Sequence, residues 1–397
     1  MSGELVVLDV GSGLTKGGRA SQSLPSVVVP TVAGAAPKKI SVLKKKAAEE
    51  DSVMGGKPYL IGEDAIAAIG RINVDSPMEH GVVKNWGQME HILRSVLDTL
   101  GADIAQDGVV LTQPSFNPLE NSETFAQLMF ETFDAKSFAF ASQGPCALYA
   151  SGRTTGIVLD SGEGITQCLP IYDSFIVNRA ANRINIGGKD VGDHFTRILF
   201  ERGYNFTGPA DRFLVQKIKE ELCYVSTDYA KELDGPEAEI LESFGLPDGQ
   251  SIEVGKERFR ATEILFNPTI IHSEMPSFPT FVTTAVKGCG LDIRPHLLGN
   301  IVLTGGNTMF NGFADRIKED VLKFFPGFGG VKVVEAPDRK YAVWAGASVL
   351  STLSSFKESI IPKAAYEEHG PSIVHGFKRD VPEEEEEEDI PPPPPEE

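Results

Sequence analysis

The chain lacks several features that would place it in whole classes of protein. Its four cysteines, Cys146, Cys168, Cys223 and Cys289, are scattered over 397 residues without a C-x-x-C pair, so we expect reduced thiols and neither a disulfide framework nor a zinc site. No apolar run approaches the roughly 18 residues of a membrane-spanning helix. Residues 1–5 also lack the basic and apolar regions of a secretory signal.

The chain also lacks an excess of basic residues. Its net charge of −19 argues against nucleic acid as the main partner. Part of the negative charge lies near the end, where residues 383–388 are six consecutive Glu and residues 391–395 are five consecutive Pro. We expect residues 376–397 to form a disordered acidic tail that ends with polyproline II character.

What the chain does contain is one motif that occurs twice. Residues 7–15 read VLDVGSGLT and residues 158–166 read VLDSGEGIT, so both follow the pattern V-L-D-x-G-x-G-φ-T with φ aliphatic. The two aspartates, Asp9 and Asp160, are 151 positions apart, which is about one domain length. We interpret the repeat as two related domains, each of which offers an Asp-Gly-x-Gly loop to the same anionic ligand.

The residue types of the motif fit a phosphate and a divalent cation. Each copy begins with a short apolar run, which predicts a buried strand, and its glycines allow backbone N–H groups to form a concave anion site. Aspartate can hold a hydrated Mg²⁺ that bridges phosphates, and Lys16 can reach a phosphate as a point charge. There is no Walker A loop, and the third glycine of Gly11-x-Gly13-x-x-x-Gly17 comes one place too late for a Rossmann fingerprint.

The order of the expected elements indicates a mixed or parallel sheet flanked by helices. Periodicity predicts helices at residues 86–100, 120–133, 188–202 and 210–230. Strands are expected at residues 109–111, 156–160 and 300–304, and the last of these runs into a Gly-Gly turn suited to backing a nucleotide base or ribose. Residues 34–57 interrupt the pattern with a Lys-rich and then acidic insertion, which is either a solvated loop or a partner-contact loop.

Longer segments resemble actin and the actin-related proteins over most of residues 5–375. They include DVGSGLTK (9–16), PMEHG (77–81), LYASGRTTGIVLD (148–160), IKEELCYV (218–225), ERFR (257–260), LTGG (303–306), RKYAVW (339–344) and GPSIVH (370–375). Sugar kinases and seventy-kilodalton heat-shock chaperones share only the two Asp-Gly loops and the Gly-Gly turn. The resemblance therefore favours the actin group over a small-molecule kinase of the same superfamily.

The resemblance implies the actin fold. This is an α/β fold of two related ribonuclease H-like domains, each with two subdomains, and ATP or ADP with Mg²⁺ or Ca²⁺ lies in the cleft between them. It assigns residues 1–149 to the first domain, with 34–57 as a mobile loop insertion and with residues 340–375 completing it. Residues 150–339 form the second domain, and residues 376–397 are the tail.

The resemblance also implies roles for individual residues. The predicted catalytic residues are Gln143, Gln167 and Asp160, and Gln143 matches a glutamine that helps to position the attacking water. Asp9 and Asp160 are expected to hold the metal ion through water. The predicted contacts to the nucleotide are Ser12, Gly13, Leu14, Lys16, Gly162, Glu163, Gly164, Gly188, Lys219, Glu220, Gly306, Met309, Phe310 and Lys340.

A cleft for protein partners is predicted as well. Its residues match the apolar groove of the family, which receives amphipathic helices: Tyr149, Ala150, Gly152, Thr154, Leu350 and Leu353. The alternative is that these are simply buried core residues. His80 matches a histidine that is often methylated in actins.

Several positions depart from the pattern of the family. Glu163 stands where actins usually carry Asp, Gln216 replaces an Arg near the base, and Gln167 replaces a His that helps to orient the attacking water. Because glutamine cannot usefully accept a proton, Gln167 predicts slower hydrolysis, with neutral drift beside an intact Gln143 as the alternative.

The segments that would make filament contacts also depart from the family. The insertion at 34–57 is long and Lys-rich, and residues 270–284 carry two prolines in place of a hydrophobic plug. The sequence therefore supports ATP binding better than self-assembly.

Taken with the resemblance, these features predict a divergent actin-like cytoskeletal protein of the cytoplasm that binds Mg-ATP, hydrolyses it slowly and forms or joins filaments. The alternative is a non-polymerising subunit of a larger complex, of the chromatin-remodelling or dynein-activator type, for which a nuclear location is open. Expected partners are the protein itself, profilin- or gelsolin-type proteins at the cleft, and a polyproline-binding protein at residues 391–395. The tail could equally be only solubilising, and neither nucleic acid nor a membrane is an expected partner.

Overall fold

The fold is built on two β-sheets that repeat one pattern. The computed structural model describes residues 4–36 and 59–376. The predicted insertion beyond Ala36 and the predicted tail beyond Gly376 lie outside these ranges. No helix in the described ranges is both long enough and apolar enough to cross a membrane.

The first sheet has six strands in the order β18-β9-β8-β1-β2-β3. Their bounds are β1 (Leu5–Val10), β2 (Leu14–Arg19), β3 (Val27–Pro30), β8 (Gly108–Gln113), β9 (Ser137–Ser142) and β18 (Ile361–Pro362). β1 and β2 form an antiparallel hairpin, whereas β1, β8 and β9 run parallel. β1 reads as a continuous apolar run because both faces of this sheet are covered.

The second sheet repeats this arrangement with the order β12-β11-β10-β16-β17, and β13 pairs with β11. The bounds are β10 (Gly156–Ser161), β11 (Thr166–Tyr172), β12 (Phe175–Ile176), β13 (Asn182–Ile184), β16 (Ile301–Thr304) and β17 (Val333–Val334). β10 and β11 form the hairpin, and β10, β16 and β17 run parallel. The motif repeated in the sequence is therefore the start of a structural repeat.

Helices cover the sheets. The longer ones are α3 (Trp86–Leu100), α4 (Leu119–Gln127), α6 (Gly188–Glu201), α7 (Asp211–Leu222), α10 (Phe278–Lys287) and α12 (Phe313–Phe324). The shorter ones are α2 (Gly62–Ala67), α8 (Tyr229–Asp234), α9 (Glu257–Arg260), α11 (Arg294–Leu298), α14 (Lys363–His369) and α15 (Ile373–Gly376). Small two-stranded sheets are formed by β4 (Ala33–Ala35) with β5 (Tyr59–Ile61), β6 (Met78–Glu79) with β7 (Val82–Val83), and β14 (Glu242–Gly245) with β15 (Ser251–Val254).

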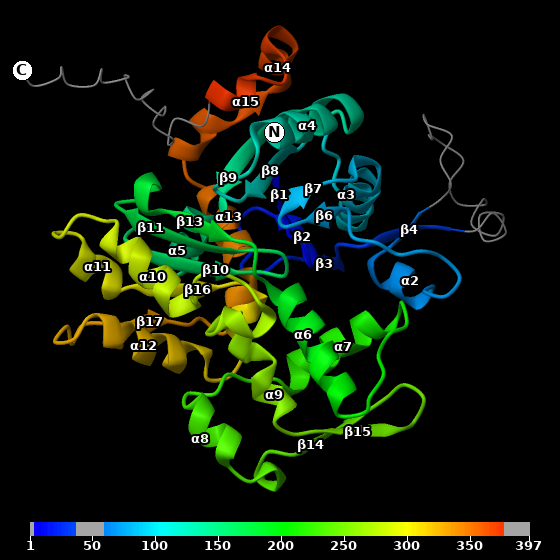
Figure 1. Cartoon of the computed structure of the whole chain (residues 1–397). Coiled ribbons are helices and arrows are strands. Elements are labelled where there is room, and N and C mark those ends of the chain that lie inside the picture. Colours follow the sequence, from blue (N-terminus) through cyan, green and yellow to red (C-terminus); the bar gives the residue numbers. More distant parts are fainter. Residues whose placement is uncertain (1–3, 37–58, 377–397) are drawn as a thin grey trace, which may run out of the picture.

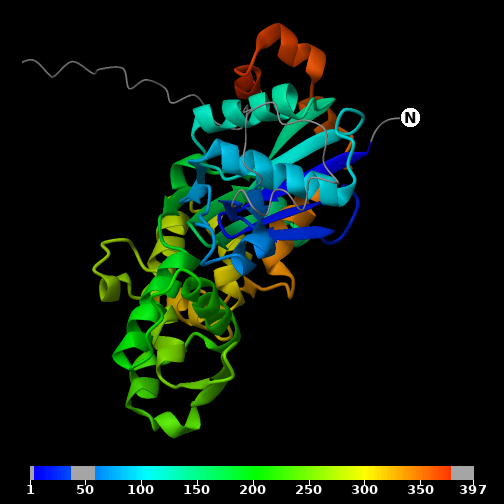
Figure 2. The same ribbon diagram turned by 90° about the vertical axis from the view of Figure 1, so that its right-hand side faces the viewer.

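The two sheets define two halves of the molecule. In Figures 1 and 2 the blue and cyan segments lie with the red C-terminal helices, and the green, yellow and orange segments lie together on the other side. Each half has its own large apolar core, one around Phe138 and one around Phe195. This arrangement agrees with two domains, while the residue bounds predicted for them stay a prediction.

The chain passes between the halves twice, at α5 (Gln143–Ala150) and at α13 (Ala342–Leu350). α5 leads from β9 to β10, and α13 leads back from β17 to the first sheet. The two helices pack so closely that a Cβ atom on Gly346 would lie 1.7 Å from the carbonyl oxygen of Cys146. The buried Trp344 also donates from Nε1 to the carbonyl of Val7 at 2.9 Å. The two crossings therefore form one closely packed junction.

Most predicted elements agree with the structure, and one does not. The helix predicted at 86–100 is α3, which begins after Asn85, whose side chain accepts from the N–H of Gln88. The prediction of one helix over 210–230 is wrong beyond Leu222. Cys223 is extended, and Val225 donates from its N–H to the carbonyl of Asn311 at 2.8 Å. This tertiary contact ends α7.

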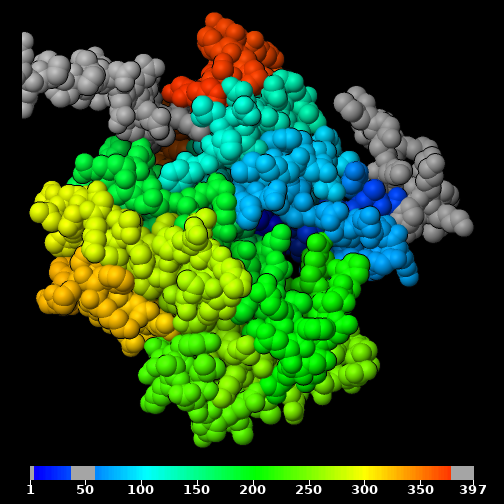
Figure 3. Space-filling view, in the orientation of Figure 1, coloured from blue at the N-terminus to red at the C-terminus, as the bar shows by residue number. Residues whose placement is uncertain are grey.

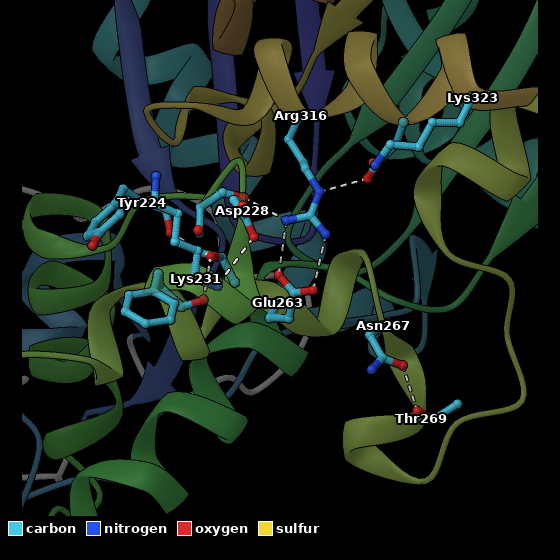
Figure 4. Close-up of polar contacts among 12 residues, drawn as sticks. Tyr224, Asp228, Lys231, Glu263, Asn267, Thr269, Arg316 and Lys323 are labelled. Atoms are coloured by element: carbon cyan, nitrogen blue, oxygen red, sulfur yellow. Dashed lines mark hydrogen bonds and ion pairs between the residues drawn. The ribbon is translucent and has the colours of Figure 1, made fainter. Parts of the chain in front are cut away.

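The polar contacts in Figure 4 hold α12 against the 3₁₀ helix Thr262–Leu265. The Arg316 guanidinium lies 3.3 Å from the carboxylate of Glu263 and 2.7 Å from that of Asp320. It also donates to the carbonyl of Ser226 at 2.6 Å. Burial raises the pKa of Glu263 although Arg316 lowers it, so the ion pair only partly offsets the loss of solvent around this carboxylate.

Candidate functional site

The two Asp-Gly loops meet face to face between the halves. A Cβ atom on Gly13 would lie 3.0 Å from Cβ of Glu163, and one on Gly164 would lie 2.7 Å from Oγ of Ser12. Gly13 and Gly164 therefore permit an approach that larger residues would block. In Figure 3 a recess opens between the light-blue segment of α2 and α3 and the green segment of α6 and α7, with dark-blue N-terminal residues at its floor.

Strand register places equivalent neighbours beside each aspartate. Asp9 lies opposite Lys16 on β2 and Thr112 on β8. Asp160 lies opposite Gln167 on β11 and Thr304 on β16. At equivalent strand positions, the first half therefore has the ammonium group of Lys16 beside its aspartate, and the second half has the neutral amide of Gln167.

Asp9 is buried and its carboxylate is fully engaged. Lys16 Nζ lies 2.6 Å from Oδ2, and the Thr112 hydroxyl donates to Oδ1 at 2.5 Å. Asp9 retains 3% of its accessible surface. A buried carboxylate is expected to have such partners, and Lys16 is the partner that can exchange Asp9 for a phosphate.

Asp160 has a different electrostatic environment. Burial, together with the negative charge of Asp9, raises the pKa of Asp160 to about 6, while Lys16 and a hydrogen bond from Gln167 lower it. A divalent cation near Asp9 and Asp160 would offset the repulsion between the two carboxylates. The described residues offer no group of three or more His, Cys, Asp or Glu side chains that could hold a metal ion. An ion at this site would therefore take most of its ligands from water and phosphate.

The three predicted catalytic residues lie together. Gln167 is fully buried on β11, and its Oε1 accepts from the backbone N–H of Ser115 at 3.1 Å. Its Nε2 lies 3.4 Å from Oε1 of Gln143, the first residue of α5. Gln167 also lies opposite Asp160 in the pairing of β10 with β11. Gln167 thus connects a strand of the second half with two segments of the first.

A second group of predicted residues gathers at the N-terminus of α6. Lys219, which is 2% exposed over its side chain, donates to the carbonyl of Gly188 at 2.6 Å and lies 3.7 Å from the Glu163 carboxylate. Asn307 donates to the carbonyl of Gly162 at 3.1 Å. A Cβ atom on Gly188 would lie 2.3 Å from Oε2 of Glu163. The N–H groups of Gly188 and Lys189 donate to the carbonyls of Gly162 and Glu163 at 2.9 Å, so these contacts join the start of α6 to the second Asp-Gly loop.

Other predicted contact residues are placed less directly. Glu220 on α7 accepts from Gln216 one turn earlier. Phe310 is buried in the apolar core of the second half, and Lys340 is exposed with Nζ 4.9 Å from the Tyr341 ring centroid. Leu14, Gly162 and Met309 are half-buried, and Gly306 is exposed. None of these placements tests a contact with a nucleotide.

A segment that the motif search did not assign to the site connects both loops. His80 Nδ1 lies 3.1 Å from the carbonyl of Gly164, and the N–H of Gly81 donates to Oγ of Ser12 at 3.2 Å. Arg183 donates to the carbonyl of His80 at 2.5 Å. His80 and Gly81 have φ values of 45° and 73°, in the left-handed region. Sequence motifs did not predict these contacts, nor those of Thr112, Ser115 and Asn307.

Two surface hollows lie away from the loops. One of about 430 Å³ is lined by Phe116, Arg183 and Met275 among others, and one of about 310 Å³ lies between β5 and α3 beside Tyr59 and His91. Neither is lined by a residue of the two Asp-Gly loops. The site is therefore defined by its polar contacts rather than by these hollows.

The predicted partner cleft lies at the ends of α5 and α13. Ala150, Gly152 and Thr154 are exposed, Leu353 is 45% exposed, and Tyr149 and Leu350 are half-buried. Val349, which the sequence did not single out, is 49% exposed beside them. These residues are therefore at the surface, and the alternative of a buried core does not describe them.

One comparison with known proteins bears on the whole chain. A sequence model for the family described as Actin matches residues 2–378. The match includes both loops, the segment around His80 and both crossings between the halves.

Proposed function

Since the chain belongs to the actin family, we propose that it is a divergent actin-like cytoskeletal protein that binds Mg-ATP between its two halves, hydrolyses it slowly and forms or joins filaments. Proteins of this family bind a nucleotide and a divalent cation, and the mixed α/β structure agrees with the predicted actin fold. The observation that carries the proposal is the meeting of the two Asp-Gly loops, one from each sheet.

The residues of the recess fit the expected ligand. Lys16 would exchange part of its contact with Asp9 for a phosphate, and the backbone N–H groups of both loops would surround the phosphate oxygens. Asp9 and Asp160 would hold water molecules of the cation. The bound cation neutralises phosphate charge, which is its main contribution to phosphoryl transfer. Gln143 would orient the attacking water, and Lys219 with Gly188 would contact the sugar side.

The first experiment is sedimentation with Mg-ATP across a range of protein concentrations, with phosphate release followed in the same samples. A pellet above a critical concentration, with phosphate release that follows assembly, is the expected result. Tight ATP binding with neither pellet nor release would point to the second candidate, a non-polymerising subunit of a larger complex. Absence of ATP binding would contradict the proposal.

One observation favours the second candidate. In the segment that aligns with the hydrophobic plug, Ile270 and Ile271 pack against the core of the second half, whereas Met275 is 44% exposed. Its tip is the exposed His272, with φ of 56°, followed by the exposed Glu274. Apart from Met275, this segment offers little apolar surface to a neighbouring subunit.

Partners are proposed at two places. The cleft beside Val349 and Leu353 would receive an amphipathic helix of a profilin- or gelsolin-type protein. Leu353→Asp should abolish such binding, whereas Phe200→Asp, at an exposed position on α6 rather than on α5 or α13, should not. The polyproline residues 391–395 would bind a polyproline-binding protein, which is tested by comparing chain 1–376 with the full chain. A cytoplasmic, cytoskeletal location is part of this proposal.

A further inference from the structure

The orientation of the Gln167 side chain follows from one unambiguous donor. The backbone N–H of Ser115 can only donate, so the atom of Gln167 that it contacts at 3.1 Å must be the carbonyl oxygen. The other end of the amide is therefore the NH₂ group. This end faces Gln143, and Gln167 lies opposite Asp160 in the pairing of β10 with β11.

This orientation fixes the neighbouring glutamine. An NH₂ group at Gln167 requires an acceptor at Gln143, so the carbonyl of Gln143 is the end held toward β11, at 3.4 Å. Among the residues that the structure describes, no hydrogen bond is made by Nε2 of Gln143, and this atom is not one of the buried polar atoms without a partner. The NH₂ end of Gln143 is thus the end left free.

The chemistry of water attack requires the opposite end. A water molecule that attacks phosphorus must point a lone pair at the phosphorus atom and give its protons to acceptors. A carbonyl oxygen accepts such a proton, whereas an NH₂ group donates to the lone pair that the reaction needs. The Gln143 carbonyl oxygen keeps a second lone pair, but its hydrogen bond to Gln167 holds this oxygen toward β11 and so restricts the positions at which it can accept from the water.

We propose that Gln167 is a positioning residue that restrains Gln143 through the Ser115–Gln167–Gln143 hydrogen-bond chain and so keeps hydrolysis slow until the chain is broken. The inference rests on the proposed function, because it assigns regulation to the same site. It differs from the simpler idea that glutamine is only a poor substitute for histidine. On that idea the Gln167 amide assists weakly, and its removal slows the reaction.

Gln167→Met in the full-length protein separates these ideas. Methionine has a similar length but makes neither hydrogen bond, so it releases the Gln143 carbonyl. We expect single-turnover phosphate release at saturating Mg-ATP to rise roughly tenfold, a change of the size that repositioning a catalytic group produces. The gain should vanish in Gln143→Met/Gln167→Met, because it depends on the Gln143 carbonyl. A rate for Gln167→Met at or below that of the wild type would overturn the proposal.

Hydrogen exchange gives a readout that does not depend on turnover. The Ser115 amide should exchange roughly tenfold faster in Gln167→Met, because its acceptor is gone, and at an unchanged rate in Gln143→Met. Equal exchange in Gln167→Met and wild type would overturn the hydrogen-bond chain. If the Met variant does not fold, Gln167→Leu is the second variant, because leucine also makes neither hydrogen bond. It should release phosphate faster with the Ser115 amide less protected, and a slower rate would count against the inference.

The two levels of the proposal fail in different ways. If the wild type binds no ATP, the proposed function is wrong and the restraint has nothing to act on. If the wild type binds and hydrolyses ATP while Gln167→Met is slower, the proposed function stands and only the restraint is wrong.

Discussion

At the scale of single residues, the site depends on side chains that have two alternative partners. Lys16 pairs with Asp9 at 2.6 Å, and the same amine lies beside the loop where phosphate is expected. Asp9 also accepts from Thr112 and does not lose all its partners when Lys16 turns away. The Thr112 hydroxyl therefore keeps Asp9 hydrogen-bonded when the Lys16 ammonium group turns from Asp9 to a phosphate.

Lys16→Met should weaken ATP binding by roughly 10- to 100-fold. The variant loses one charge-assisted hydrogen bond to phosphate, which is worth about 1.5–3 kcal/mol, and leaves the charge of Asp9 uncompensated. Titration of a fluorescent ATP analogue measures the effect. Lys323→Met is the matched control, because Lys323 is 72% exposed and lies on α12 away from the loops. Equal affinities of the Lys16 variant and wild type would remove Lys16 from the site.

Residue patterns predicted the two loops but not the contacts between distant segments. The repeated V-L-D-x-G-x-G-φ-T pattern located Asp9 and Asp160 because a short apolar strand and a glycine turn are local features. Thr112 and His80 are adjacent to the loops only through strand pairing and tertiary folding. A motif search has no access to such neighbours. Thr112 could have been proposed only once β8 was paired with β1.

At the scale of elements, periodicity predicts a helix and tertiary contacts set its end. α3 agrees with the prediction because its cap and its apolar stripe are both local. The helix predicted through residue 230 stops at Leu222, since Arg258 donates to the Leu222 carbonyl at 2.8 Å and the next residues join Asn311. These partners come from segments more than thirty residues away. The helical spacing of apolar residues continues beyond Leu222 to Val225, so periodicity alone does not indicate that the helix ends at Leu222.

Gly346→Ala should destabilise the fold by about 1–3 kcal/mol, because an added methyl group would overlap the Cys146 carbonyl and push α13 away from α5. Urea unfolding measures the change. Gly87→Ala on α3 is the matched control, since a Cβ there meets only the Asn85 side chain at 3.7 Å, and it should be neutral or stabilising. Equal stabilities of the two variants would show that the helix contact can relax.

Arg316→Met should destabilise the second half by about 3 kcal/mol at pH 7, because it leaves the buried Glu263 charge without its cation. The loss should shrink as the pH falls. The pKa of Glu263 in the folded state is already raised by burial, and removal of Arg316 raises it further. The penalty is therefore complete above that folded pKa and disappears below the unfolded value of about 4.3.

Urea unfolding of Arg316→Met at pH 7.5 and pH 5 measures this dependence. The double variant with Glu263→Gln is the control, because the titrating group is then absent and most of the pH dependence should be lost. A loss of stability that is the same at both pH values would show that Glu263 is not the source.

At the scale of the whole molecule, a ligand between the loops would connect two halves that have separate cores. Removal of nucleotide and cation with EDTA and apyrase should therefore lower the Tm. Ligand at a hundred times its Kd contributes about 2.7 kcal/mol to stability. Calorimetry with and without Mg-ATP measures the shift. Lys16→Met should show a smaller change in Tm at the same ligand concentration. An equal Tm of the wild type with and without Mg-ATP would argue against a site between the halves.

The two passages of the chain also limit how the halves can move. A single linker would leave two bodies three rotations and a range of translations. Here α5 and α13 are both covalent connections, and they are pressed together at Gly346 and Cys146. Two adjacent attachments restrict translation of one half against the other, so the motions that remain are rotations about the junction. We expect opening of the recess to be a rotation about this junction, so a change that bends the α5–α13 junction should change the width of the recess.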